Sequence, residues 1–191
     1  MRLTKLACFT LPLVGALTLV RTAKADLIIE QPGAHPDYKL EIEPHLTFPL
    51  DFDGVGIGVR LSAPVVHNGF VQTINNNVAV SFGLDWVHFD GCYRGWGWRR
   101  YGWCGGNLNF FQVPVELQWN FFLASHWTLF AELGLAIQRF QYTGDWEYYG
   151  YSPSRTRLHL VGHLGARYHF NESTALTLRL GEVSSLGVSF W

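Results

Sequence analysis

The chain has 191 residues, and its 14 lysine and arginine residues against 15 aspartate and glutamate residues give a formal net charge of −1 at pH 7. Charged residues make up only 15% of the chain and aromatic residues 16%, whereas the surface of a soluble domain usually carries about 25–35% charged residues. This composition argues against an ordinary soluble domain whose whole surface faces water.

The first predicted element is a secretory signal peptide over residues 1–25. Two basic residues precede an uncharged run over residues 6–20, and Ala23-Lys24-Ala25 has the small-residue pattern that signal peptidase cleaves. The run is short for a membrane-spanning helix, which needs about 20 residues. We therefore expect the mature chain to begin at Asp26, with a periplasmic segment over residues 26–37.

The rest of the chain alternates apolar and polar residues with period two, which is typical of strands with two different faces. In residues 157–170, for example, leucines at even positions oppose Arg157, His159 and His163 at odd positions. Most segments are about ten residues long, the length that a tilted strand needs to cross a bilayer. The predicted strands are 38–48, 55–63, 78–86, 111–121, 127–138, 157–170, 175–181 and 185–191.

The alternation leaves open which face meets water. A soluble barrel would place the apolar face inside, whereas an outer-membrane barrel places it outside, between two levels of aromatic residues. The polar faces are rich in small residues with few charges, and aromatic residues gather near both ends of the apolar faces. We therefore predict an all-β fold, a single eight-stranded antiparallel up-and-down transmembrane barrel that is apolar outside and has a polar, plugged interior. A soluble periplasmic ligand-binding barrel is the alternative. The aromatic residues are Trp119, Phe121, Trp127, Tyr168 and Phe170 at one end, and Trp86, Tyr142 and Trp146 at the other.

The lengths of the connections fit this topology with one exception. Residues 123–126 and 171–173 are short and are expected to face the periplasm, whereas 91–107 and 143–154 are long and are expected to face outward. Residues 66–77 are too long for a periplasmic turn, so either the strand before them is extended or they form a small ordered excursion.

Three stretches, FFQVPVELQWNFF, WTLFAELGLAI and GHLGARYHFNESTALTLRLGEVSSLGVSFW, resemble the final strands of small outer-membrane β-barrels of the OmpA-like, porin-like superfamily. The resemblance covers residues 38–191 at the level of pattern, and it implies an architecture and the outer membrane of a Gram-negative bacterium rather than an activity. Members commonly end in an aromatic residue that the barrel-assembly machinery reads. The resemblance therefore implies an assembly signal at Phe190 and Trp191, with Phe190 in the lipid-facing series and Trp191 one residue out of phase.

An eight-stranded barrel is just wide enough inside for its own side chains, so ionisable groups in the lumen need partners. Counting outward from a turn centred near Ala124 places Glu116 opposite Glu132, and three arginines reach comparable heights. We expect a charge network that plugs the lumen, without a catalytic residue, metal or cofactor. Its members are Glu116, Glu132, Arg60, Arg167 and Arg179.

Two other uses of the lumen stay open. In a lipid-modifying enzyme, acting on lipid A or phospholipid, His159 or His163 beside Glu132 would supply a base and its orienting group. Ser152 and Ser154 lie near the rim, but no catalytic spacing surrounds them. A small conduit for hydrophobic solutes is the other use.

The connection 91–106, GCYRGWGWRRYGWCGG, is expected to contact the outer leaflet. Cys92 and Cys104 are the cysteines that remain after cleavage, and export makes a disulfide the expected state. Guanidinium groups suit the phosphates of lipopolysaccharide, and tryptophan suits a lipid boundary or a sugar. The extracellular position excludes nucleic acid as a partner. The candidate binding residues are Arg94, Trp96, Trp98, Arg99, Arg100 and Trp103.

The sequence thus predicts a monomeric, non-enzymatic barrel with a structural or surface-interaction role. Its expected partners are outer-membrane lipid, lipopolysaccharide or an external ligand, and the barrel-assembly machinery.

Overall fold

The computed structural model describes residues 26–49, 54–89, 92–94, 102–104, 106–144 and 154–191, and the predicted signal peptide lies outside them. The described residues contain no helix that is long and apolar enough to span a membrane. Their strands are β1 (Glu41–Phe48), β2 (Gly54–Val66), β3 (Asn76–Phe89), β4 (Cys92–Arg94), β5 (Gly102–Cys104), β6 (Gly106–Ala124), β7 (Trp127–Gly144), β8 (Ser154–Asn171), β9 (Thr174–Gly181) and β10 (Ser184–Phe190).

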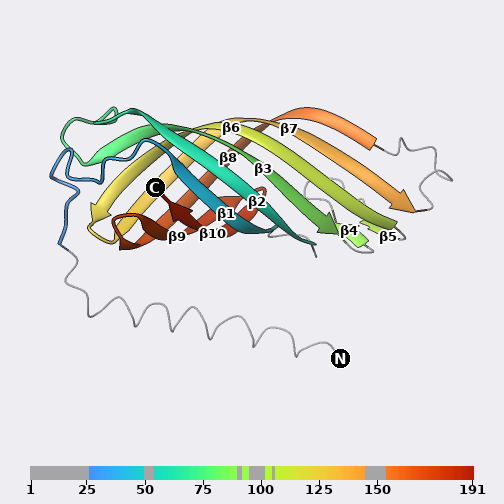
Figure 1. Ribbon diagram of the computed structural model, residues 1–191. Coiled ribbons are helices and arrows are strands. Elements are labelled where there is room, and N and C mark those ends of the chain that lie inside the picture. Colours follow the sequence, from blue (N-terminus) through green and yellow to red (C-terminus); the bar gives the residue numbers. More distant parts are fainter. Residues whose placement is uncertain (1–25, 50–53, 90–91, 95–101, 105, 145–153) are drawn as a thin grey trace, which may run out of the picture.

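Eight of these strands close into one barrel, in the order β1-β10-β9-β8-β7-β6-β3-β2, and each neighbouring pair is antiparallel (Figure 1). The remaining two, β4 and β5, form a separate hairpin within the connection from β3 to β6. The up-and-down eight-stranded barrel predicted from the alternation is therefore confirmed. The hairpin is an addition, because its strands of three residues are too short for alternation to reveal.

The apolar side chains point out of the barrel and the polar side chains point into it. On β7, Leu133 is 62% exposed, whereas Glu132 is 4% exposed and Thr128 is fully buried. The same reversal holds on β8, where Leu164 is 67% exposed and the neighbouring His163 is buried. A soluble barrel would hide its leucines, because burial of apolar surface drives folding in water. The alternative of a soluble ligand-binding barrel is therefore wrong.

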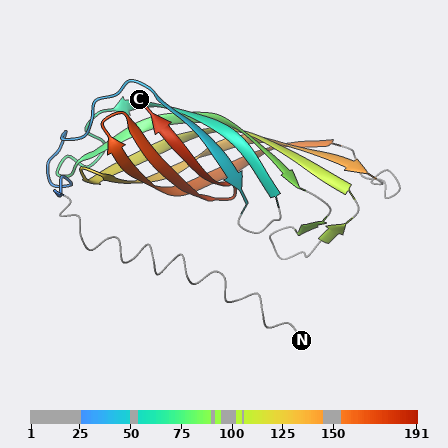
Figure 2. The ribbon, with the colours of Figure 1, turned by 60° about the horizontal axis from the view of Figure 1, so that its bottom comes forward.

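The wall of the barrel is uneven in height. β6, β7 and β8 have 19, 18 and 18 residues, whereas β9 and β10 have 8 and 7. Figure 2 shows the short red strands β9 and β10 ending well before the orange strands β7 and β8. β6, β7 and β8 thus have nearly twice the predicted length of about ten residues, and they extend the wall toward the side that carries the long connections.

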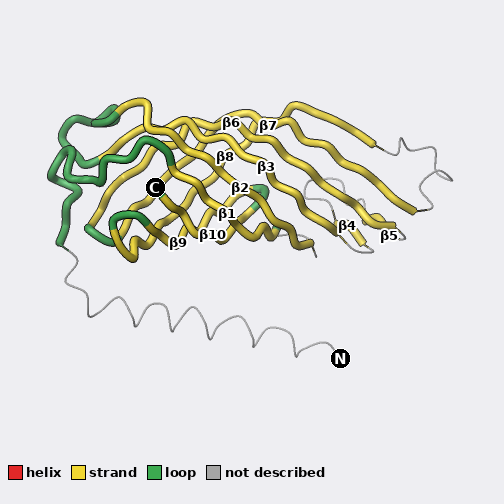
Figure 3. Tube along the Cα trace, in the orientation of Figure 1, coloured by secondary structure: helices red, strands yellow, loops and turns green. Residues whose placement is uncertain are grey.

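The opposite end of the barrel carries the short turns and is closed by the segment before β1 (Figure 3). The amide of Ile28 donates to the carbonyl of Leu123 over 3.1 Å, and the amide of Asn75 donates to the carbonyl of Ile29 over 2.6 Å. The ring of His35 stacks on Phe122, with 4.4 Å between the ring centroids. Residues 26–40 therefore form a cap over this mouth of the barrel, and we call them the N-terminal cap.

The long connection between β2 and β3 is an ordered excursion that supports this cap. Its order depends on Asn76, whose side-chain amide donates to the carbonyl of Val71 over 2.7 Å and to that of Ile74 over 2.8 Å. At Gly69 the backbone has a φ of +52°, and a Cβ there would overlap the Asn76 side chain. Both explanations that the sequence left open hold in part, since β2 also extends to Val66.

The C-terminal residues divide between the two faces as the alternation predicts. Phe190 is 47% exposed on the outside, whereas the ring of Trp191 packs against those of Tyr38 and His169, with centroids 5.7 and 5.2 Å away. Burial, and after it the carboxylate of Glu41, raises the pKa of Tyr38 to about 12, so its phenol stays neutral. The C-terminus thus helps the N-terminal cap to close the mouth. The role of Phe190 and Trp191 in assembly stays a prediction.

Candidate functional site

The middle of the lumen holds eight ionisable side chains that alternate between acid and base and close into a circle. They come from seven of the eight barrel strands, because the inward positions of these strands meet at one level. We call the circle the lumen ring. Its members, in order, are Glu43, His45, Asp85, Arg60, Glu116, His163, Glu132 and Arg179.

The first half of the ring joins β1, β3 and β2. Nε2 of His45 lies 2.7 Å from a carboxylate oxygen of Asp85, and its Nδ1 lies 3.6 Å from the carboxylate of Glu43 and 3.2 Å from the Glu43 carbonyl. The guanidinium of Arg60 then links Asp85, at 3.3 Å, to Glu116, at 2.9 Å. Both nitrogens of His45 face oxygen acceptors, so both bonds form together only when both nitrogens carry hydrogen.

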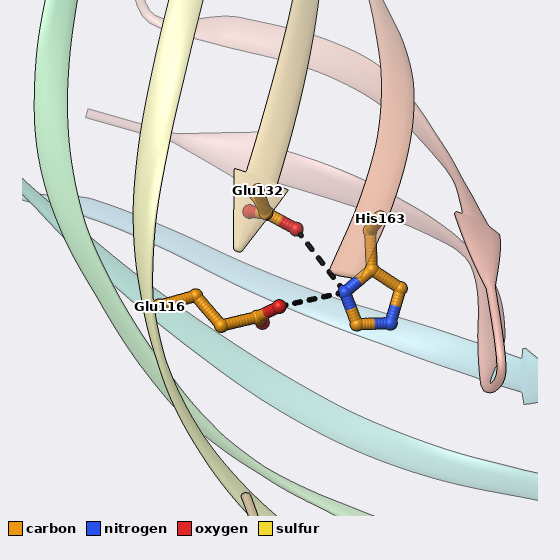
Figure 4. A group of neighbouring side chains, drawn as sticks. All are labelled: Glu116, Glu132 and His163. Atoms are coloured by element: carbon orange, nitrogen blue, oxygen red, sulfur yellow. Dashed lines mark hydrogen bonds and ion pairs between the residues drawn. The ribbon is translucent and has the colours of Figure 1, made fainter. Parts of the chain in front are cut away.

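The second half joins β6, β8, β7 and β9 and repeats the same order of groups. Nδ1 of His163 points between two carboxylates, 2.8 Å from Glu116 and 3.7 Å from Glu132 (Figure 4). Arg179 donates to both oxygens of Glu132, at 2.7 and 3.2 Å, and to both oxygens of Glu43, at 2.6 and 3.2 Å. Arg179 therefore closes the circle with two bidentate pairs, the strongest geometry available to a guanidinium.

An aromatic ring supports the cations of this half. Phe130 points into the lumen from β7, and the guanidinium groups of Arg167 and Arg179 lie 4.5 and 5.2 Å from its centroid. The phenyl ring of Phe130 fits there because the facing residue on β8 is Gly165, where a Cβ would overlap the phenyl ring. A cation over an aromatic face gains most where water is excluded, so this contact favours the ring geometry.

Below the lumen ring, toward the N-terminal cap, lies a second ion pair. Arg167 is 2.9 Å from a carboxylate oxygen of Glu41 and donates to the side-chain oxygen of Asn120 over 2.8 Å. The adjoining cavity, whose lining includes Arg167, Glu41 and Trp191, has a volume of about 10 Å³. That volume is close to the space that one water molecule needs, so this cavity has no room for a substrate.

Above the ring, toward the long connections, the lumen becomes first amide-rich and then apolar. Gln138 donates to Gln112 over 2.8 Å and to Glu182, on the turn from β9 to β10, over 3.0 Å. Beyond this layer a cluster of apolar side chains fills the barrel. It contains Val87, Phe89, Leu108, Phe110 and Val183, with Phe140 and Tyr142 packed against it. The described lumen is therefore filled at four successive levels.

One group of side chains in the described residues has the spacing of a metal site. Ligand atoms of Glu116, Glu132 and His163 all lie within 4.8 Å of one another. However, Arg60 already binds Glu116 and Arg179 already binds Glu132, and two guanidinium groups beside the site would repel a cation. The geometry fits charge pairing better than metal binding.

The arrangement also bears on the enzyme alternative. Nδ1 of His163 is directed at Glu116 and Glu132 rather than at a hydroxyl group, and His159 faces Glu182 at 3.2 Å. Ser152 lies outside the described residues, and Ser154 lies at the start of β8, nine residues from His163 along the strand. Ser154 is therefore not placed beside His163 as a nucleophile would be.

The five residues that the sequence singled out all lie in the lumen, but not in the expected register. Glu132 pairs with Gln118, and Glu116 pairs with Gly134, because a bulge between Phe122 and Ala124 moves the centre of the turn. The two carboxylates meet through His163 rather than directly. Arg167 lies one level below the ring.

Sequence reasoning missed three of the eight members of the lumen ring. Glu43, His45 and Asp85 lie on polar faces that the alternation identified, so a count of every ionisable residue on those faces would have found them. The heights of Glu43 and His45 could not be counted, because they depend on the pairing of β1 with both β2 and β10 across the closure of the barrel. The height of Asp85 depends on the pairing of β3 with β2 and β6.

The predicted surface residues lie largely outside the described part of the chain. Trp96, Trp98, Arg99 and Arg100 are not described, whereas the backbones of Arg94 and Trp103 lie in β4 and β5. In this hairpin Cys92 and Cys104 are direct cross-strand partners. Such partners have Cα atoms about 4.5–5.5 Å apart, which suits a disulfide. The disulfide itself stays a prediction.

No protein-family model matches the chain, and no curated protein matches it in sequence. Solved structures do match its fold. The outer membrane protein OprG from Pseudomonas aeruginosa is 12% identical, with a TM-score of 0.50 over 84% of this chain and 98% of that one. Ail, the attachment invasion locus protein of Yersinia pestis, is 14% identical, with a TM-score of 0.49 over 82% of this chain and 98% of that one.

The likeness to OprG shows the fold. The reversed side-chain distribution adds a physical reason, since an exterior of exposed leucine, valine and isoleucine needs lipid to cover it. The chain is therefore an integral β-barrel of the outer membrane.

Proposed function

We propose that this protein is a closed, non-enzymatic barrel that acts through its extracellular surface, where the connection 91–106 contacts lipopolysaccharide or an external ligand. The observation that carries the proposal is the filled lumen. The lumen ring, the apolar cluster above it and the N-terminal cap below it leave little room for a solute or for a substrate.

The connection 91–106 is the part of the outer surface whose composition best suits a ligand. It carries three arginines and three tryptophans between two cysteines, and the β4–β5 hairpin gives it a fixed base. Guanidinium groups bind phosphate through paired hydrogen bonds, and tryptophan covers sugars or the lipid boundary. These properties support contact with phosphorylated glycolipid in the outer leaflet.

A binding measurement tests this role. In the variant Arg94→Gln/Arg99→Gln/Arg100→Gln, affinity for purified lipopolysaccharide should fall at least about tenfold, since one lost charge-assisted hydrogen bond is worth that much. Lys39→Gln, at the periplasmic end, is the control and should bind as the unchanged protein does. Equal affinity of the unchanged protein, the triple arginine variant and Lys39→Gln for lipopolysaccharide would refute the binding role of the connection 91–106.

The closed lumen has its own test in a planar lipid bilayer. The purified protein should show no steady ion conductance, because the ring leaves no continuous water path. Stable single-channel steps from the unchanged protein would contradict this part of the proposal and would favour the conduit.

A further inference from the structure

The upper part of β8 has a free edge. β8 pairs with β7 from Ser154 to Tyr168, but it pairs with β9 only from His163 downward. Residues 155–162 therefore have no strand partner on that side among the described residues. The cause is the uneven wall, since β9 ends at Gly181 and the chain turns back into β10.

This edge lies where the apolar exterior ends on the extracellular side. Leu158 and Leu160 point outward and are 67% and 64% exposed, and Ile137 is the β7 partner of Leu158. The next outward pair toward the long connections is Thr156 with Arg139, both polar and exposed. The free edge thus crosses from the hydrocarbon level to the headgroup level of the outer leaflet.

The same place gathers cationic side chains. Arg139, at an outward position of β7, and Arg155, at an inward position of β8, are exposed. Arg157, at the next inward position of β8, is partly exposed, and its Nε donates to Gln138 over 2.8 Å. The other arginines with described side chains, in the lumen, are buried. Among the described residues, the acidic side chain that contacts this rim is Glu182, which lies 3.4 Å from Arg157 and 3.2 Å from His159. Within the described part of the rim, three arginines stand against this one carboxylate.

A second copy of this chain does not fit the edge. Two copies inserted in one membrane have the same orientation, so their β8 edges would run in the same direction. Strands of such barrels tilt by about 35–45°, so these edges would cross at about 70–90° and could not pair along their length. Backbone groups at hydrocarbon level nevertheless need partners.

We infer that the rim formed by Arg139, Arg155 and Arg157, with the free edge of β8, binds the phosphorylated headgroup of lipid A, the membrane anchor of lipopolysaccharide. This inference deepens the proposed function, because it adds a second contact with the same glycolipid. The arginines pair with phosphate, the free edge donates its amide hydrogens to headgroup oxygens, and the exposed leucines contact acyl chains.

Glu182 limits the affinity of this site for phosphate. Its carboxylate occupies Arg157 and His159 in the absence of lipid, so a phosphate must compete with it. Replacing Glu182 with glutamine removes the competing charge and should increase affinity. A variant that merely disturbed the fold would lower affinity instead.

The experiment measures lipid binding to the detergent-solubilised full-length protein by native mass spectrometry. The probes are bisphosphorylated lipid A, the same lipid without phosphates, and phosphatidylglycerol. Arg139→Gln/Arg155→Gln/Arg157→Gln should lower affinity for bisphosphorylated lipid A at least about tenfold, and Glu182→Gln should raise it. Heat-modifiable migration on a gel confirms that each variant is folded.

The controls separate this site from the proposed loop contact. Arg94→Gln/Arg99→Gln/Arg100→Gln removes the same charge elsewhere, and its effect bears on the loop alone. Unchanged affinity in the rim variant, full affinity for lipid A without phosphates, or equal affinity for phosphatidylglycerol would each overturn the inference. Retained affinity without phosphates would point instead to an extended chain or acyl chains on the β8 edge.

Discussion

At the scale of single residues, the lumen is governed by the cost of burying charge. A charge moved out of water is costly unless it is paired and hydrogen-bonded, and each member of the lumen ring has two neighbours of opposite type. Glu116, for instance, lies between Arg60 and His163. The ring therefore tolerates four buried carboxylates in one cross-section, but it makes the barrel sensitive to the loss of any single partner.

Removing Arg179 should be the most damaging single change. Arg179→Met leaves the carboxylates of Glu43 and Glu132 facing each other without a cation, a loss that costs about 3–5 kcal/mol for a buried pair. The midpoint of unfolding by guanidinium chloride in detergent should fall clearly, whereas Arg155→Met, at the exposed rim, should leave it unchanged. Adding Glu43→Gln and Glu132→Gln to the Met variant should recover part of the loss. No recovery would argue against charge pairing as the cause.

The carboxylates that the sequence singled out provide a second test. Glu116→Gln together with Glu132→Gln leaves Arg60 and Arg179 each with one carboxylate instead of two. The unfolding midpoint in detergent should fall, though less than for Arg179→Met, because each arginine keeps one partner. Glu172→Gln, on an exposed periplasmic turn, is the matched control. An unchanged midpoint in the double variant would show that the ring contributes nothing to stability.

At the scale of elements, the N-terminal cap and the excursion between β2 and β3 act as one unit. The excursion holds the cap through Asn75, whose amide donates to Ile29 and whose side chain lies 2.6 Å from His35. The cap in turn covers Phe122, which is only 4% exposed although it lies two residues before the end of β6. The N-terminal cap and the excursion, which have irregular backbone, thus close one end of the barrel.

Removal of the cap should uncover the lumen side of β6 without unfolding the barrel. In a variant lacking residues 26–35, a cysteine introduced by Phe122→Cys should react with a water-soluble maleimide many times faster than in the full chain. Ser125→Cys, exposed in the turn, should react equally in both. Cys92→Ser and Cys104→Ser are present in every sample, so that the introduced cysteine is the thiol that reacts. Equal protection of the Phe122→Cys thiol with and without the cap would contradict the closing role.

The sequence predicts the barrel well because its main signal is local. Alternation on segments such as 157–170 decides strand and face together, and the structure confirms both for Leu164 and His163. Relations across the barrel are not local. One bulge in β6 changed the residue that faces Glu116 from the predicted Glu132 to Gly134. The ion pair of Arg179 with Glu43 joins residues that are 136 positions apart in the sequence. The alternation within one strand does not predict which side chains meet across the lumen when the barrel closes.

At the scale of the whole molecule, two features follow from one reversed pattern. Leucine, valine and isoleucine face lipid, and the ionisable residues have only one another to bind, so they close the lumen. The uneven wall then raises β6, β7 and β8 above the rest and leaves the β8 edge free beside exposed arginines. These features support the proposal that the protein interacts through its rim and loops rather than through its interior.

The orientation of the apolar face is the claim on which the rest depends, and spin labels along the outward positions of β7 test it directly. Single cysteines are introduced at Trp127, Leu129, Leu133, Ile137 and Arg139 in an otherwise cysteine-free protein, labelled, and reconstituted in lipid bilayers. Collisions with oxygen, relative to those with a water-soluble nickel chelate, should be most frequent at Leu133 and should fall toward both ends. Frequent collisions with the nickel chelate at Leu133 would show that this face meets water and would contradict the account.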